Sequence, residues 1–312
     1  MEQQIQNILA QVTTKTNKIK QLINLGLTRT QIAQLVTNGN YGFVQNVYAK
    51  MKAQGLLNNL GTIIAVSAAF TRKFGVEFEA YNVTKEKLNN ALNSAGIRCR
   101  IEGYNHNDSE TSWKIVSDAS LHGNNTFELV SPILKGESGI QELEKVCRIL
   151  NECGAKVNKS CGTHVHMDAR NMPLKTWKNI YKNYARLENV IDAFMPLSRR
   201  DNFYCNSFRN IRNFESKINS ATSLNEIATI FGSRRYYKIN PVSYSRHNTC
   251  EFRQHSGTIE FEKIGTWVRF LNNLIDFSAN NLITEATLEG LKQFNSTEIV
   301  NFFKTRTNKF AA

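Results

Sequence analysis

The chain has 312 residues, of which 41% are hydrophobic and 10% aromatic, and it contains only four prolines. This composition excludes a disordered or low-complexity protein and supplies enough apolar residues for a core, in one large domain or in two. The 39 lysine and arginine residues exceed the 26 acidic residues by 13, which favours anionic partners such as nucleic acid or nucleotide phosphates.

Neither a membrane span nor a secretory signal is expected. The longest apolar run, residues 63–70, is far shorter than the ~20 residues that a membrane-spanning helix needs. Glutamine and asparagine interrupt the first eleven residues, so no apolar signal segment is predicted there. We therefore expect a cytoplasmic protein whose six cysteines remain reduced thiols, because a chain with a full-sized core does not need disulfides.

Residues 1–58 are predicted to form a small all-helical domain. Thr28 and Gln31 offer a capping box, residues 38–40 form a turn, and apolar residues at helical spacing continue from 43 to 51. This order resembles the helix-turn-helix domains of resolvases and phage regulators, which implies a last helix that enters the major groove of duplex DNA. Six basic residues against one acid favour DNA, but the candidate reading face lacks arginine, so a protein-protein adaptor remains an equal alternative.

A linker is expected at residues 59–73, followed by a domain of residues 74–312 that mixes strands and helices. Period-2 and helical patterns there predict an α+β fold. Helices are expected at 84–95, 138–154 and 173–194, and strands at 74–79, 97–101, 113–118, 126–132, 161–168 and 249–255.

Charged side chains alternate with apolar ones along four of these strands. Alternate positions share a face of a strand, so the predicted sheet has one apolar side under helices and one polar side. Neighbouring carboxylates on such a side repel one another unless a cation lies between them. For any single strand, a water-exposed edge or histidines that merely line a wet surface are the structural alternatives. The polar side is predicted to carry Glu77, Glu79, Glu128, His164, His166, Glu251, Arg253 and His255.

Six segments, in order, resemble the phage and bacterial amidoligases of the glutamine-synthetase-like carboxylate-amine ligase superfamily. They cover about residues 74–280 and read FGVEFE, WKIVSDASL, FELVSPIL, CGTHVHMD, SRRDNFYC and CEFRQHSGTIEFEKI. The resemblance implies a curved antiparallel sheet, with helices on one face, around a site for ATP and Mg²⁺. It also implies ATP-dependent joining of a carboxylate to an amine. Chemistry agrees, because phosphoryl transfer from ATP activates a carboxylate as an acyl phosphate that an amine attacks.

The resemblance also implies roles for individual residues. Metal binding is expected from Glu77, Glu79, Glu128 and His166. Catalysis is expected from Arg253, which would stabilise the transferring phosphoryl group, together with Glu251 and Lys238. Contacts to nucleotide, phosphate or substrate are expected from His164, His255, Arg199, Arg200 and Asp118.

Two other classes of function stay open at this point. A metal-dependent hydrolase is the enzymatic alternative, because a His-x-His pair on a strand also serves zinc and iron sites, although such sites use few carboxylates. The non-enzymatic alternative is a DNA-binding regulator whose ligase-like domain is inactive and senses a ligand. Peptides, cell-wall amines, small metabolites and modified nucleobases are all candidate substrates of a ligase.

Overall fold

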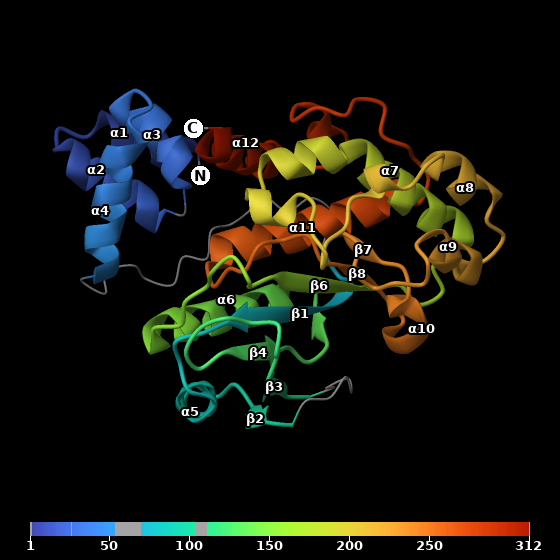
Figure 1. Cartoon of the computed structure of the whole chain (residues 1–312). Helices are drawn as coiled ribbons and strands as arrows, with labels where there is room; N and C mark the ends of the chain where they lie inside the picture. Colours follow the sequence, from blue (N-terminus) through green and yellow to red (C-terminus); the bar gives the residue numbers. More distant parts are fainter. Residues whose placement is uncertain (1, 26, 54–69, 104–110, 312) are drawn as a thin grey trace. The chain divides into compact units, whose positions relative to one another are not determined.

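The computed structural model describes residues 2–25, 27–53, 70–103 and 111–311 (Figure 1). Contacts between residues divide the chain into two compact units, 1–66 and 67–312. Most of the expected linker, 59–73, lies outside the described residues, so its limits remain a prediction.

The N-terminal unit contains four described helices. They are α1 (Glu2–Ala10), α2 (Lys15–Asn24), α3 (Arg29–Thr37) and α4 (Tyr41–Ala53). The predicted capping box forms at the start of α3, where Thr28 accepts from the backbone of Gln31 and the Gln31 side chain accepts from the backbone of Thr28. Asn38 ends α3 in the left-handed conformation, which reverses the chain into α4. Apolar residues from α2, α3 and α4 form the core of this unit, including Leu22, Ile32 and Val44.

The larger unit is built on a mixed eight-stranded sheet, so the α+β class is confirmed. Its order is β2-β3-β4-β1-β6-β8-β7, and β5 pairs with β1. The strands are β1 (Lys73–Ala80), β2 (Cys99–Ile101), β3 (Trp113–Val116), β4 (Phe127–Val130), β5 (Leu134–Lys135), β6 (Thr163–Asp168), β7 (Ile239–Asn240) and β8 (Thr249–Phe252).

The expectation of a wholly antiparallel sheet is wrong at one edge, where β2 and β3 are parallel. The side-chain amide of Asn93, in the last turn of the preceding helix, bonds both the N–H and the carbonyl of Cys99. These two bonds fix how the chain enters β2 at the edge of the sheet. The other paired strands are antiparallel.

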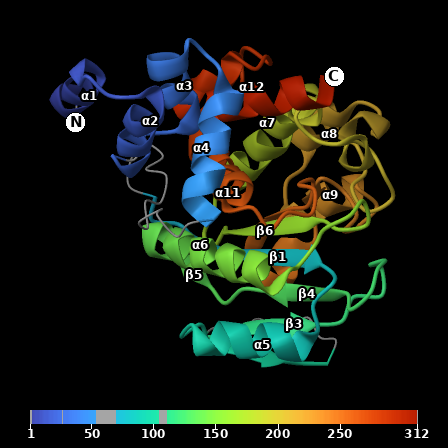
Figure 2. The same ribbon diagram turned by 90° about the vertical axis from the view of Figure 1, so that its left-hand side faces the viewer.

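Helices cover the apolar face of the sheet (Figures 1 and 2). Phe78, Val165 and Phe252 are fully buried there. Tyr184 packs on Phe252 with 5.7 Å between ring centroids. Gly139 lies in the helix Gly136–Cys153. A Cβ at this position would lie 3.0 Å from the ring of Phe74, so glycine allows the helix to approach the sheet closely. The described helices of the larger unit are α5 (Lys85–Ser94), α6 (Gly136–Cys153), α7 (Leu174–Ala193), α8 (Phe214–Ser220), α9 (Leu224–Ile230), α10 (Ser243–His247), α11 (Phe261–Ser278) and α12 (Thr297–Ala311), with 3-10 turns at Leu197–Arg199, Phe208–Asn210 and Gly290–Gln293. Of these, α10 lies at the polar face of the sheet.

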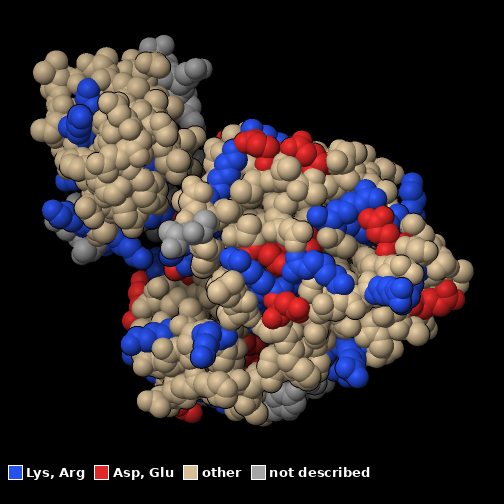
Figure 3. All heavy atoms as spheres, turned by 45° about the horizontal axis from the view of Figure 1, so that its top comes forward, with Lys and Arg blue, Asp and Glu red and all other residues tan. Residues whose placement is uncertain are grey.

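Two sequence expectations concern the whole chain. All six cysteines are buried free thiols, as predicted. Among the described helices, none combines the length and the apolar character needed to cross a membrane. On the face of the larger unit drawn in Figure 3, acidic and basic side chains are intermixed, so the positive net charge does not form a single-sign field there.

Candidate active site

A cavity of about 850 Å³ lies over the polar face of the sheet. Its floor is formed by β1, β4, β6 and β8, and its walls by residues 118–120, by residues 233, 235 and 236, and by α10. Pockets of this size hold small-molecule ligands in other proteins. The face of the sheet opposite to the helices therefore has room for a substrate.

Strand register brings the acidic and histidine side chains of this face together. Glu77 on β1 lies opposite His164 on β6, and Glu79 on β1 lies opposite Glu128 on β4. His166 lies opposite Glu251 on β8. Because cross-strand neighbours on one face have Cβ atoms about 5 Å apart, these groups form one continuous cluster.

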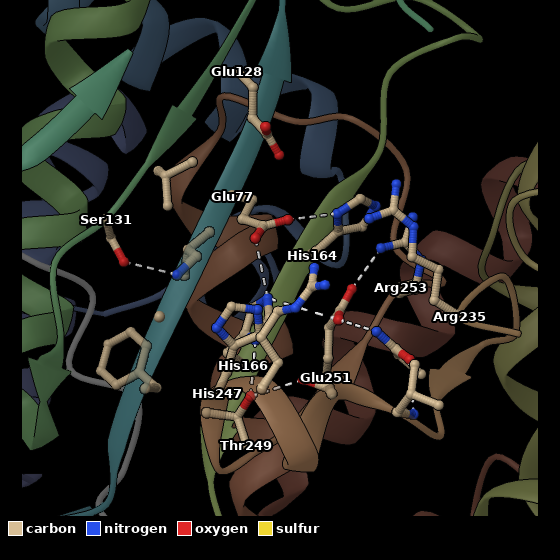
Figure 4. Close-up of a pocket in the computed structure, with 18 of the residues that line it drawn as sticks. Glu77, Glu128, Ser131, His164, His166, Arg235, His247, Thr249, Glu251 and Arg253 are labelled. Atoms are coloured by element: carbon tan, nitrogen blue, oxygen red, sulfur yellow. Dashed lines mark hydrogen bonds and ion pairs between the residues drawn. The ribbon is translucent and has the colours of Figure 1, made fainter. Parts of the chain in front are cut away.

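Glu77 is the centre of the cluster (Figure 4). Its Oε2 lies 2.9 Å from Nδ1 of His164 and its Oε1 lies 3.2 Å from Nε2 of His166. Burial alone would raise the pKa of Glu77, but the charge of His166 and hydrogen bonds from both histidines hold that pKa well below 4.5. The second nitrogen of His166 is 2.9 Å from Oγ1 of Thr249, which fixes the orientation of the ring.

On the β8 side, Glu251 is held by two donors. Nη1 of Arg253 lies 2.5 Å from one carboxylate oxygen, and the amide of Asn240 donates to the other at 2.6 Å. Burial opposes ionisation of Glu251, but Arg253 and His166 lower its pKa to about 2. The pKa of His166 responds in the opposite sense: burial lowers it, whereas Glu251 and Glu77 raise it to about 9.

The β4 side of the cavity is acidic. Burial, followed by the negative charges of Glu77, Glu79 and Asp118, raises the pKa of Glu128 well above 4.5. One oxygen of Glu79 accepts the backbone N–H of Gly162 at 2.5 Å. These carboxyl groups thus converge where a cation would relieve their repulsion.

Three overlapping sets of side chains have ligand atoms within 4.8 Å of one another. Glu77 and Glu128 each belong to two of these sets. Each set contains at least two carboxylates and no cysteine, a donor set that suits hard cations such as Mg²⁺ better than zinc. The sets are Glu77 with His166 and Glu251, Glu77 with Glu128 and His164, and Glu79 with Asp118 and Glu128.

Most of the residues that the sequence singled out line this cavity. They are Glu77, Glu79, Asp118, Glu128, His164, His166, Arg199, Glu251 and Arg253. Arg199 acts mainly on the backbone, since its guanidinium donates to the carbonyls of Arg253 and Gln254. It therefore holds the segment that follows β8 against the cavity wall.

Lys238 does not line the cavity, contrary to the expected catalytic position. It is fully buried and forms ion pairs of 2.7 and 2.6 Å with Glu188 and Asp192 of α7. Two acids on the covering helix attract the lysine, so its charge is neutralised within the core.

His255 and Arg200 also lie away from the cavity lining. The expected strand 249–255 ends at Phe252, so the alternation of faces does not continue to His255. The His255 ring is buried 5.6 Å from that of Trp267, and its Nδ1 is 2.7 Å from the carbonyl of Ser256. Arg200 donates to the carbonyl of Met195.

Sequence reasoning missed several residues of the cavity wall. Arg235 and Tyr236 belong to a basic and aromatic run whose only residue chosen from sequence was Lys238. Lys114 lies on β3 and is only 2% exposed although it lines the cavity. Its place between the apolar Trp113 and Ile115 of the expected strand 113–118 was the sequence signal that could have placed it on the polar face.

The geometry defines an α+β protein with an acid- and histidine-rich cavity on one sheet face. Residues 70–275 match the model of a family described as "Putative amidoligase enzyme". The match covers more than half of the chain and includes the whole cavity lining, and the chain belongs to this amidoligase family. No curated protein matches the chain. Family membership indicates a ligase-type function.

Proposed function

We propose that the larger unit is an ATP- and Mg²⁺-dependent ligase that joins a carboxylate to an amine. The observation that carries this proposal is the convergence of four carboxyl groups and two histidines from β1, β4, β6 and β8 beside the buried Arg253. Activation of a carboxylate by phosphoryl transfer needs cations that neutralise phosphate charge and an arginine at the transferring group.

The donor sets fit Mg²⁺ because they are dominated by carboxylates, and because Glu128, whose pKa is raised by burial and then by Glu77, Glu79 and Asp118, lies among these acids. Glu77, Glu79 and Glu128, with His166 and Glu251, are the residues that would hold metal. Bound Mg²⁺ would supply Lewis-acid stabilisation of phosphate oxygens. We also propose, as part of the ligase function, that the sheet has a glutamine-synthetase-like arrangement.

The chain's own residues have distinct tasks in this reaction. Arg253 neutralises the charge of the transferring phosphoryl group, and Glu251 fixes its guanidinium. The carboxylate is converted into an acyl phosphate, with ADP as the leaving group. The amine then attacks the carbonyl carbon, phosphate leaves, and the amide forms. Asp118, at the acidic side of the cavity, is suited to bind the amine in its cationic form before it loses a proton.

The first test measures ATP consumption and hydroxylamine trapping. Purified protein with Mg²⁺ and ATP is screened against carboxylate panels, and hydroxylamine serves as the amine so that an activated carboxylate is detected by mass as a hydroxamate. We expect Glu77→Gln and Arg253→Met to lower turnover about 100-fold or more, because the first removes a proposed metal ligand and the second removes the guanidinium that neutralises phosphoryl charge.

Glu152→Gln on α6 is the matched control, because Glu152 is 67% exposed and does not line the cavity. It should retain wild-type turnover. Unchanged ATP turnover in both site variants would rule out the ligase. Metal-dependent hydrolysis of a test substrate in the absence of ATP would instead support the alternative of a metal-dependent hydrolase.

A further inference from the structure

Three aromatic rings form a cluster at one side of the cavity. The centroid of Phe203 lies 5.2 Å from that of Tyr204 and 5.2 Å from that of Tyr236, and the two tyrosine rings are 5.6 Å apart. Tyr204 and Tyr236 line the cavity. Phe203 and Tyr204 are 67% and 45% exposed, although most large apolar side chains of this unit are buried. Grouped exposed aromatics mark binding sites more often than isolated ones do.

Hydrogen bonds hold the cluster in place. The backbone N–H and the side-chain amide of Asn206 both donate to the carbonyl of Tyr236, at 2.9 and 2.8 Å. The N–H of Tyr204 donates to the side chain of Asn202 at 2.7 Å. Two loops that are distant in sequence are thus joined before any ligand arrives, and such preorganisation reduces the entropy lost on binding.

Arginines give this cluster a positive character. Cζ of Arg235 lies 5.1 Å from the ring centroid of Tyr236, and Cζ of Arg253 lies 6.0 Å from the same centroid. Arg253 is 8% exposed, and among the described residues no atom accepts a hydrogen bond from its Nε. Its Nη1 bonds Glu251, so one guanidinium connects the aromatic cluster with the carboxylate cluster.

These charges select the kind of ligand. A cationic amine is repelled by two guanidinium groups, whereas an aromatic ring linked to anionic groups is attracted by them and stacks on the tyrosines. A nucleoside triphosphate has this combination of a planar base and negative charge.

We propose that Tyr204 and Tyr236 form the subsite for the base of a nucleoside triphosphate, with Phe203 as its outer wall and Arg253 toward the phosphates. This inference rests on the proposed function, since it assumes that the phosphates lie at the carboxylate cluster. The base then stacks at the β8 side of the cavity, and the acidic β4 side is left for the amine.

The test compares ATP with inorganic tripolyphosphate, each with Mg²⁺, by calorimetric titration of the full chain. Wild-type protein should bind ATP more tightly than tripolyphosphate. Tyr236→Leu and Tyr204→Leu should each weaken ATP binding about five- to a hundredfold, the usual effect of losing a stacking ring, and change tripolyphosphate binding less than about twofold. Tyr236→Phe keeps the ring and should keep the ATP affinity.

Leu197→Ala is the matched control, because Leu197 is 78% exposed in the same loop region and does not line the cavity. It should leave both affinities unchanged. If both tyrosine variants bind ATP like the wild type, or lose ATP and tripolyphosphate equally, the base subsite is wrong while the ligase proposal stands. The base subsite is equally wrong if the variants weaken binding of an aromatic second substrate and leave ATP binding unchanged. If wild-type protein binds neither ligand, both proposals fail.

Discussion

At the scale of single residues, the neighbours of each buried carboxyl group of the site set its protonation, and they do so in opposite directions. Two histidines lower the pKa of Glu77 and Arg253 lowers that of Glu251, whereas burial, followed by the neighbouring acids, raises the pKa of Glu128. Carboxyl groups whose pKa values are driven apart in one cavity are typical of functional sites, because packing for stability alone avoids unpaired buried acids.

His255 provides a pH prediction outside this cluster. Burial, followed by the charge of Arg306, lowers its pKa well below 6.5, so the folded chain keeps the ring neutral whereas the unfolded chain takes up a proton below that pH. The unfolded state therefore binds more protons, and the free energy of unfolding falls as the pH drops below 6.5 and is fully retained above it. His255→Gln cannot take up this proton, so its stability should fall less than that of the wild type between pH 7 and pH 5.

Urea denaturation at a series of pH values measures this difference. His122→Gln, at an exposed position, is the control and should follow the wild-type profile. If the free energy of unfolding changes with pH in the same way for wild type and His255→Gln, the lowered pKa of His255 is contradicted.

At the scale of elements, period-2 alternation was the sequence signal that located most of the site. It placed Glu77, Glu79 and Glu128 on one face because each lies inside a regular strand, and the register then aligned these strands. The same logic held at Arg253, the first residue after β8, but failed at His255, which turns into the core.

Charged residues in irregular segments follow no regular spacing, so the directions of their side chains could not be predicted from the sequence. Gly232 and Ser233 adopt positive φ values of 62° and 53°, and this turn redirects the chain that follows. As a result Arg235 faces the cavity and Lys238 faces α7, although both belong to one basic run. The sequence shows residues 234–238 as one basic and aromatic run, but not which of its members reach the site.

A close approach of two elements gives a further prediction. The N–H of Gly257, in the segment after β8, donates to the carbonyl of Cys161 at 2.8 Å, just before β6. A Cβ at Gly257 would lie 2.5 Å from Cβ of Cys161 and 3.1 Å from its backbone, so Gly257→Ala must push these segments apart. We expect a loss of about 1–3 kcal/mol in the free energy of unfolding, measured by urea denaturation.

Gly103→Ala is the control for this substitution, since a Cβ at Gly103 meets no atom of the described residues within 4 Å and the backbone there does not require glycine. It should change the unfolding free energy by less than about 0.5 kcal/mol. Equal effects of the two substitutions would show that the contact with Cys161 yields easily.

At the scale of the whole molecule, the basic residues of the N-terminal unit bear on how that unit would bind DNA. Cζ of Arg29 lies 4.8 Å from the ring centroid of Tyr48, and its guanidinium bonds Gln45, so α4 already engages the arginine of α3. The remaining basic groups of this unit are lysines, including Lys50 and Lys52 in the last turn of α4. Lysine contacts to phosphate carry no sequence information, so lysines that act in this way would support DNA binding that is independent of sequence.

We therefore expect the full chain to bind duplex DNA at low salt, with an affinity that falls steeply as salt is added, because binding releases counterions. Lys50→Glu combined with Lys52→Glu should weaken binding in a gel-shift assay, whereas Lys309→Glu on α12 should have less effect. Absence of binding by the wild type at low salt would favour the protein-protein adaptor.

The strand order of the larger unit also has a consequence for synthesis on the ribosome. Glu77 and Glu251 are contributed by strands that are translated far apart, and β6 lies between them in the sheet. A nascent chain that has emerged only as far as α7 has paired one side of β6, while the side that β8 will occupy presents unpaired backbone groups. The incompletely synthesised chain can therefore aggregate through the unpaired edge of β6. Pairing of β8 with β6 removes that edge and also completes the cavity floor.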